Sequence, residues 1–150
     1  MYVSVVITCH NEDAYIKQCV NSVVAQSDYK HINEIFVVDD GSTDSSPKIL
    51  AQLKLNCDKL KIFTTKGLGL PAARNIGIKS ATSDFIAFLD GDDYWTKNKL
   101  QNQLKAFDND SLIGLIYGDY WDFTKNDSTD ATFISVRSLN RFHKNQLVEY

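Results

Sequence analysis

Two apolar runs that end in carboxylates constrain the fold of this chain most. Residues 85–89 (FIAFL) precede an acidic tetrad at 90–93 (DGDD), and residues 35–38 (IFVV) precede an acidic pair at 39–40. Short apolar runs of β-branched and aromatic residues, bounded by Gly and Asp, indicate buried strands. Ligands of open α/β sheets bind beyond the carboxyl ends of the strands, so we expect both acidic segments at one binding edge.

Strand-like and helix-like segments alternate over most of the chain. We expect strands at residues 3–8, 34–38, 60–65, 85–89 and 112–120, and helices at 15–24, 47–53, 71–78 and 97–107. Asn11 or Asp13 is expected to cap the first helix, and Pro47 and Pro71 suit first helical turns. The alternation predicts an α/β protein with a mainly parallel sheet and helices on both faces.

Three finer expectations concern helix packing and the last thirty residues. The small residues Ala72, Ala73 and Gly77 give the 71–78 helix a thin face that can pack close to a sheet or a ligand. A polar loop is expected at residues 125–130 and a further strand at 131–136. Residues 137–150 contain few apolar anchors and show no clear ending.

Length and composition indicate one domain with an ordinary core. The chain has 150 residues, 43% of them hydrophobic, and a net charge of −3. It shows no basic patch of the kind that nucleic-acid binders carry and no apolar run of membrane-spanning length. Cys9, Cys19 and Cys57 lack metal-ligand spacing, so we expect free thiols. Together with a start that does not resemble a signal peptide, this predicts a cytoplasmic protein. Attachment to the inner face of the membrane would need regions outside this chain.

The acidic segments predict two kinds of contact. Asp92 and Asp93 offer oxygen ligands for Mg²⁺ or Mn²⁺, which need only one or two protein carboxylates when phosphates supply the rest. Asp40, expected at the solvent edge, can accept a hydrogen bond from the N3–H of a uracil-type base. Simple turn chemistry remains an alternative for both segments. Calcium loops are excluded, because Leu50 and Gln101 stand where such loops need Glu.

A glycine pattern permits another interpretation. Gly67-x-Gly69-x-x-Ala72 follows an expected strand and opens an expected helix, as the dinucleotide-binding fingerprint does. That fingerprint normally opens the fold, whereas two strand–helix units precede it here. A loop near a bound nucleotide is the alternative, with Arg74 in the first turns of the helix.

Four segments, in order, resemble the motifs of family 2 glycosyltransferases, which have the Rossmann-like GT-A fold. The segments are 4–12 (SVVITCHNE), 35–44 (IFVVDDGSTD), 71–78 (PAARNIGI) and 88–93 (FLDGDD). The resemblance implies a nucleotide-diphospho-sugar donor, Mg²⁺ or Mn²⁺, and transfer to an acceptor hydroxyl with inversion. UDP is the default nucleotide, although relatives also use GDP- and dTDP-sugars.

The resemblance also implies roles for individual residues. It assigns nucleotide-sugar binding to Thr8, Cys9, Asn11, Glu12, Asp39, Asp40, Arg74 and Asp92, and metal binding to Asp93 with Asp92. Within these sets, Asp40 would meet the base and Asp92 the ribose. His10 departs from the family, which often has Tyr at this position.

Length is the larger departure from the family. Its domain usually continues past 150 residues into a half that carries the acceptor site and the catalytic base. Asp119, Asp122 and Glu149 do not match the context of that base, so the catalytic residue is expected beyond Tyr150.

We therefore expect residues 1–150 to form one nucleotide-sugar-binding domain, truncated at its acceptor-binding half. The expected function is sugar transfer in polysaccharide or glycoconjugate synthesis, with a saccharide or lipid-linked acceptor. A non-catalytic nucleotide-binding module and an NAD-type enzyme are the alternatives.

Overall fold

The computed structural model describes residues 1–118, 120–122, 132–134 and 140–143. The chain divides into two compact units, Met1–Asn102 and Gln103–Tyr150, and each is described by itself. None of the helices in these described ranges combines the length and the apolar content that a membrane span needs.

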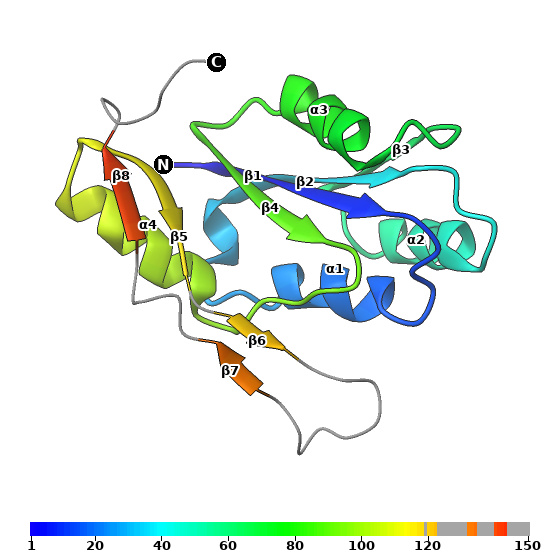
Figure 1. The fold of residues 1–150 in the computed structure, drawn as a ribbon, viewed down its shortest axis with the longest axis horizontal. Helices are drawn as coiled ribbons and strands as arrows, with labels where there is room; N and C mark the ends of the chain where they lie inside the picture. The colour runs from blue at the N-terminus through cyan, green and yellow to red at the C-terminus, as the bar shows by residue number, and fades with distance from the viewer. Residues whose placement is uncertain (119, 123–131, 135–139, 144–150) are drawn as a thin grey trace. The chain divides into compact units, whose positions relative to one another are not determined.

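A parallel four-stranded sheet forms the centre of the first unit. Its strands are β1 (Val3–Cys9), β2 (Ile32–Asp39), β3 (Leu60–Thr64) and β4 (Phe85–Asp90), in the order β3-β2-β1-β4. Figure 1 shows them side by side with their carboxyl ends at the same edge. All residues of β1 are buried, which explains why this central strand is almost continuously apolar.

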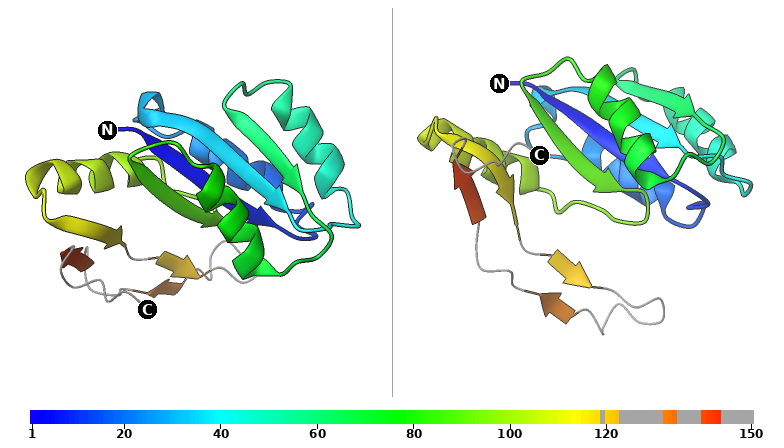
Figure 2. Two further views of the ribbon diagram at one scale, coloured as in Figure 1. Left: turned by 90° about the horizontal axis from the view of Figure 1, so that it is seen from above. Right: turned by 45° about the horizontal axis from the view of Figure 1, so that its top comes forward.

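Three helices of the first unit cover both faces of this sheet. In Figures 1 and 2, α1 (Ile16–Val24) and α2 (Ser46–Lys54) lie on one face and α3 (Leu70–Ser80) on the other. The buried residues of α1 recur at helical spacing: Ile16, Cys19, Val20 and Val23. A 3₁₀ turn, Tyr29–His31, leads into β2. The predicted arrangement of a mainly parallel sheet between helices is therefore confirmed.

Close contact between α3 and the sheet depends on a glycine. A Cβ atom on Gly77 would lie 2.3 Å from Cγ1 of Val6, a buried residue of β1. Real Cβ atoms do not approach another carbon atom so closely, so only glycine allows this spacing of helix and sheet. The predicted thin face of the helix therefore packs against the sheet.

The boundary helix and the second unit contain the remaining elements. Helix α4 (Lys99–Asn109) crosses the boundary between the units. Strand β5 (Ile113–Tyr117) pairs antiparallel with β8 (Asn140–His143), and β6 (Tyr120–Asp122) pairs antiparallel with β7 (Thr132–Ile134). The expected strand over 112–120 is present as β5 but ends at Tyr117, and a second strand with a different partner, β6, begins at Tyr120. The expected strand at 131–136 is present as β7, and the expected loop at 125–130 lies outside the described residues.

Two further expectations are corrected near the ends of elements. Strand β2 begins at Ile32 rather than at residue 34. Neither Asn11 nor Asp13 caps α1, whose N-cap is Tyr15 without a side-chain hydrogen bond. The side-chain oxygens of Asn11 and Asp13 instead accept hydrogen bonds from backbone N–H groups of the loop after β2. A cap prediction from sequence considers only neighbours along the chain, whereas these partners are thirty-odd residues away.

Candidate functional site

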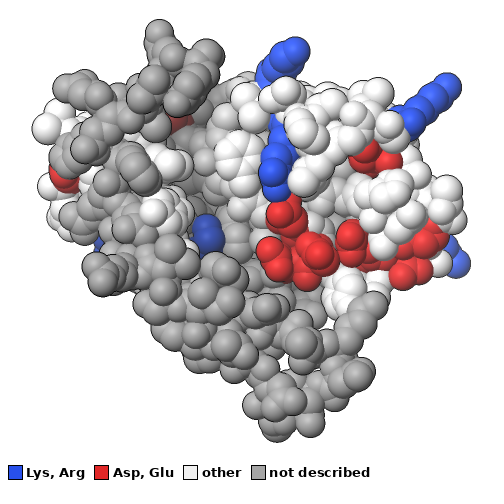
Figure 3. All heavy atoms as spheres, viewed as in Figure 1, with Lys and Arg blue, Asp and Glu red and all other residues white. Residues whose placement is uncertain are grey.

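The carboxyl ends of three neighbouring strands bring the predicted site residues together. In the register of the sheet, Thr8 of β1 lies beside Asp90 of β4, and Cys9 lies beside Asp39 of β2. The central strand β1 therefore ends between the two acidic segments, and both segments lie at one edge of the sheet, as the sequence predicts. Figure 3 shows acidic side chains gathered on this face of the first unit.

A hollow of about 240 Å³ opens at this edge of the sheet. Its lining residues are Thr8, Cys9, Glu12, Asp40, Leu70, Ala73, Asp90, Gly91 and Asp92. Five of the residues assigned to nucleotide-sugar binding are in this set. Asn11, Asp39 and Arg74 are not, and each has another structural position in the described part of the chain.

The other lining residues carry weaker sequence signals. Leu70 and Ala73 lie in the first turns of α3, directly after the glycine loop. Only this position in the chain could have indicated that they line the hollow. Gly91 lies so close to β1 that a Cβ atom would be 2.7 Å from the carbonyl oxygen of Thr8. The glycine in the acidic tetrad therefore allows the turn after β4 to pass close to the end of β1.

Asp40 is buried and hydrogen-bonded, which corrects the expectation of a solvent-edge carboxylate. It is 7% exposed, and its Oδ1 accepts hydrogen bonds from the Thr65 hydroxyl and, at 2.7 Å, from the backbone N–H of Leu68. Its Oδ2 accepts a third, also 2.7 Å long, from the N–H of Gly69. The Thr65 hydroxyl and the two loop amides lower the pKa of Asp40, so the group is ionised at neutral pH.

The same contacts argue against the dinucleotide interpretation of the glycine pattern. Gly67 and Gly69 have φ angles of 75° and 87°, in the left-handed region that favours glycine. In a phosphate-binding loop, backbone N–H groups point at the ligand. Here the N–H groups of Leu68 and Gly69 point at the carboxylate of Asp40 instead.

Asn11 and Asp39 hold loops in place rather than line the hollow. Asn11 has a φ of 58°, its N–H donates to the Ser42 hydroxyl at 2.9 Å, and its Oδ1 accepts from the N–H of Thr43 at 2.8 Å. Asp39 is 1% exposed and accepts a hydrogen bond from the N–H of Ser42. Both side chains therefore shape the loop after β2, beside the hollow.

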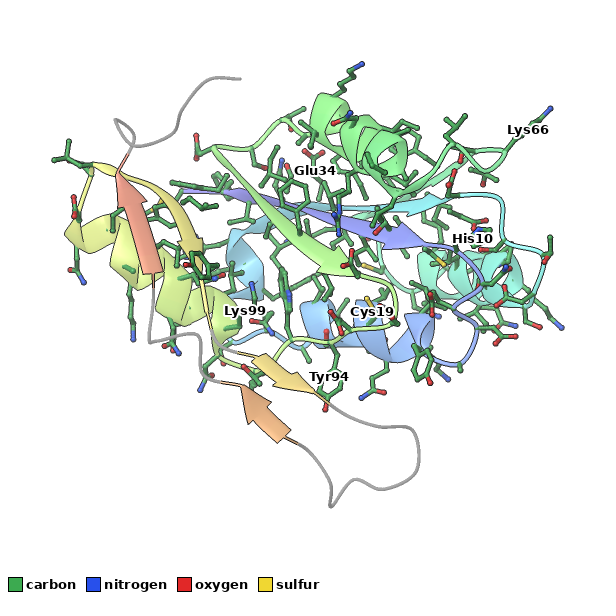
Figure 4. All side chains as sticks on the ribbon, in the orientation of Figure 1. His10, Cys19, Glu34, Lys66, Tyr94 and Lys99 are labelled. Carbon is green, nitrogen blue, oxygen red and sulfur yellow. The ribbon has the colours of Figure 1, made fainter. Side chains whose placement is uncertain are left out.

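The labelled His10 in Figure 4 belongs to the same region. It lies at the end of β1, and its Nδ1 is 2.8 Å from the carbonyl oxygen of Asp40. The histidine that departs from the family pattern thus contacts the segment that carries Asp40.

Asp90 links the end of β1 to helix α3. Its Oδ1 accepts hydrogen bonds from the Thr8 hydroxyl at 3.1 Å and from the Arg74 guanidinium at 2.6 Å. The ion pair is partly exposed, with Arg74 at 38% and Asp90 at 43%. Arg74 therefore lies beside the hollow and partly balances the acidic patch.

Both cysteines near the site are protonated thiols. Burial raises the pKa of Cys9, which lines the hollow, to about 11, and it also raises the pKa of Cys19. The Cys19 thiol donates a hydrogen bond to the carbonyl oxygen of Asp90 at 3.4 Å. All three cysteines are buried and free, as the sequence predicts, and neither of these two has the low pKa of a reactive nucleophile.

Asp92 and Asp93 lie exposed at the turn after β4. Asp92 lines the hollow, and burial and the charges of Asp92 and Asp90 raise the pKa of Asp93. In the described residues, no three His, Cys, Asp or Glu side chains are grouped to hold a metal ion. Two exposed carboxylates still fit a hard cation whose other ligands are phosphate oxygens.

An open α/β sheet with a carboxylate-lined hollow at its strand ends belongs to the class of proteins that bind ligands at this edge. The sequence profile of Glycosyl transferase family 2 matches residues 4–149. The chain belongs to this family, and the resemblance of its four motifs is confirmed.

Individual proteins similar to this chain include a glycosyltransferase and a protein of teichoic acid biosynthesis. The chain is 38% identical over 118 residues to the uncharacterized glycosyltransferase alr2836 of Nostoc sp., covering 78% of this chain and 36% of that protein. It is 39% identical over 108 residues to the minor teichoic acid biosynthesis protein GgaA of Bacillus subtilis, covering 69% and 24%. Among solved structures, S. aureus TarS 1-349 in complex with UDP-GlcNAc has a TM-score of 0.66 and 30% identity, covering 73% and 32%. The chain thus spans about a quarter to a third of these three proteins.

Proposed function

We propose that this chain forms the donor-binding part of a glycosyltransferase that moves a sugar from a UDP-sugar to an acceptor hydroxyl with inversion. The observation that supports the proposal is the hollow at the ends of β1, β2 and β4, because it is lined by carboxylates. The chain that contains it belongs to family 2. The UDP-GlcNAc bound to TarS supports the donor class, and the name of GgaA supports polysaccharide synthesis with a saccharide or lipid-linked acceptor.

In this proposal, different residues around the hollow bind different parts of the donor. Asp40 accepts a hydrogen bond from the base, Asp92 contacts the ribose, and Thr8 to Glu12 enclose the nucleoside. Arg74, already paired with Asp90, lies on the side of α3. These roles rest on the match to the family motifs and on the position of the side chains around the hollow.

A divalent cation fits the remaining carboxylates. Asp93, with Asp92, would hold Mg²⁺ or Mn²⁺, which supplies charge neutralisation for the leaving diphosphate. The general base that deprotonates the acceptor hydroxyl is proposed to lie beyond Tyr150, because this chain covers only 36% of the Nostoc relative and 24% of GgaA. Asp122 lies in β6, and Asp119 and Glu149 lie outside the described residues.

The metal role is tested by calorimetry of UDP binding with and without Mn²⁺. We expect Mn²⁺ to tighten binding by roughly tenfold or more, the size of one hydrogen bond to a charged group. Asp93→Ala should remove this dependence. Asp84→Ala is the matched control, because it removes one carboxylate just before the amino end of the same strand, where Asp84 accepts a hydrogen bond from the N–H of Tyr2. Equal affinity with and without Mn²⁺ for the unchanged chain would refute the metal role.

A further inference from the structure

We propose that Thr65 sets the base selectivity of the donor site, by leaving Asp40 one free acceptor position that suits uracil and disfavours guanine. The inference rests on the proposed function and names the residue that limits the site to a uracil nucleotide. The evidence for it is the number of hydrogen bonds that the buried carboxylate of Asp40 already accepts.

The acceptor positions of Asp40 are mostly occupied from within the chain. A carboxylate offers about four lone-pair positions, two on each oxygen. The Thr65 hydroxyl and the Leu68 amide fill both positions on Oδ1, and the Gly69 amide fills one on Oδ2. In the part of the chain that the structure describes, no other group donates to Asp40, so one position on Oδ2 is left, and Asp40 lines the hollow.

Backbone contacts position Thr65 and the loop that follows it. The N–H of Thr65 donates to the carbonyl oxygen of Asp39 at 2.9 Å, which fixes the residue to the end of β2. A Cβ atom on Gly41 would lie 3.0 Å from the backbone nitrogen of Gly67, so the loops after β2 and β3 touch. When a ligand binds, the Oδ1 atom of Asp40 therefore already accepts two hydrogen bonds from within the chain.

Bases differ in what they present to such a carboxylate. Uracil has a single ring N–H, at N3, and one acceptor position satisfies it. Guanine presents the N1–H and the N2 amine side by side, a pair that suits two free carboxylate oxygens, as a bidentate arginine does. With Oδ1 occupied, one guanine N–H group would be buried without a partner, which lowers affinity.

The first test uses the unchanged chain and four diphosphates in calorimetry. We expect UDP to bind roughly tenfold or more tightly than GDP, and N3-methyl-UDP to lose roughly tenfold or more, because it lacks the single donor. Inosine diphosphate has the purine size but only the N1–H, so it should bind more tightly than GDP. Equal affinities for inosine diphosphate and GDP would overturn the inference, and so would unchanged binding of N3-methyl-UDP.

Two variants test Thr65 itself. Thr65→Ala frees a position on Oδ1 and opens space beside it, so the ratio of GDP to inosine diphosphate affinity should rise several-fold. Thr65→Ser keeps the hydroxyl and should keep the original ratio. An unchanged ratio in a folded Thr65→Ala variant, checked by circular dichroism, would overturn the role of Thr65. The first test, with four diphosphates and the unchanged chain, does not depend on whether a variant folds. Failure of every diphosphate to bind would instead overturn the proposed function.

Discussion

At the scale of single residues, carboxylates at the two ends of the sheet have different roles. Asp40, Asp90 and Asp92 line the hollow at the carboxyl ends of the strands. Glu34, labelled in Figure 4, lies near the amino end of β2, buried among partners from β1, β3 and the loop before β4. We propose that the first group faces a ligand, whereas Glu34 stabilises the fold.

Replacement of Asp40 should weaken nucleotide binding more than it weakens the fold. Asp40→Ala removes the proposed acceptor for the base, so we expect UDP affinity to fall roughly ten- to a hundredfold, as for a hydrogen bond to a charged group. The Leu68 and Gly69 amides that it releases belong to exposed residues and can bond to water instead. Calorimetry measures the affinity and circular dichroism the fold, with Asp84→Ala as control. Undiminished UDP binding would remove Asp40 from the site.

Glu34 should make stability depend on pH in the acid range. Burial opposes its ionisation, but hydrogen bonds from Lys61, Thr82 and Ser4 outweigh this effect and lower the pKa to about 2. A carboxyl group with a lowered folded-state pKa stabilises the protein fully above its unfolded pKa, near 4.5. That contribution is lost as the pH falls from about 4.5 towards 2.

The variant that checks this is Glu34→Gln. At pH 7 it should lower the free energy of unfolding by about 1.5–3 kcal/mol, the range for hydrogen bonds to a charged group. The difference from the unchanged chain should shrink as the pH falls below about 4.5. Urea unfolding of both proteins across this range measures it, and a difference that is constant with pH would contradict the assignment.

At the scale of elements, packing of helices on the sheet determines the shape of the hollow. Helix α3 supplies Leu70 and Ala73 to its lining, and the same helix touches β1 through Gly77. The distance between this helix and the sheet therefore controls both stability and the width of the site.

Gly77→Ala should destabilise the fold although alanine is the better helix former. The gain in helix propensity is about 1 kcal/mol, whereas insertion of a methyl group into a packed core costs about 1–3 kcal/mol. The added Cβ atom would lie 2.3 Å from Cγ1 of Val6, which places this site at the upper end of that range, so a net loss of about 1–2 kcal/mol is expected. UDP affinity should fall as well.

Thermal or urea unfolding checks this prediction, with Lys79→Ala on the same helix as control, because Lys79 is exposed. In a double-mutant cycle, Val6→Ala should relieve part of the loss caused by Gly77→Ala. Strict additivity of the two changes would show that the two side chains do not clash.

The sequence predicted the elements of the first unit better than the contacts between their loops. Apolar periodicity is local, so four strands, three helices and the acidic strand ends could be read directly. The hydrogen bonds of Asp40 and of Asn11 could not be read in this way, because they join residues about thirty positions apart. Periodicity also does not show which strands pair, and therefore the boundary between β5 and β6 was missed.

At the scale of the whole molecule, the matched region determines what activity to expect. The first unit carries every residue that lines the hollow, and the chain spans 36% of the length of the Nostoc relative. Acceptor binding and general base catalysis are the functions to which no residue in the described ranges is assigned.

We expect this chain to bind a UDP-sugar but to transfer little or no sugar. General base catalysis alone contributes about 10²–10⁴-fold, and loss of acceptor positioning should cost more, because well-oriented reactants gain about 10⁵–10⁸ M in effective concentration. Slow hydrolysis of the donor by water can persist, because it needs neither the base nor the acceptor site. The measurement is transfer from radiolabelled UDP-sugars to a panel of saccharide and lipid-linked acceptors, beside a longer chain that carries an acceptor-binding half. Comparable transfer by both would place the base within residues 1–150, and the acidic residues of the second unit would then be the first to replace.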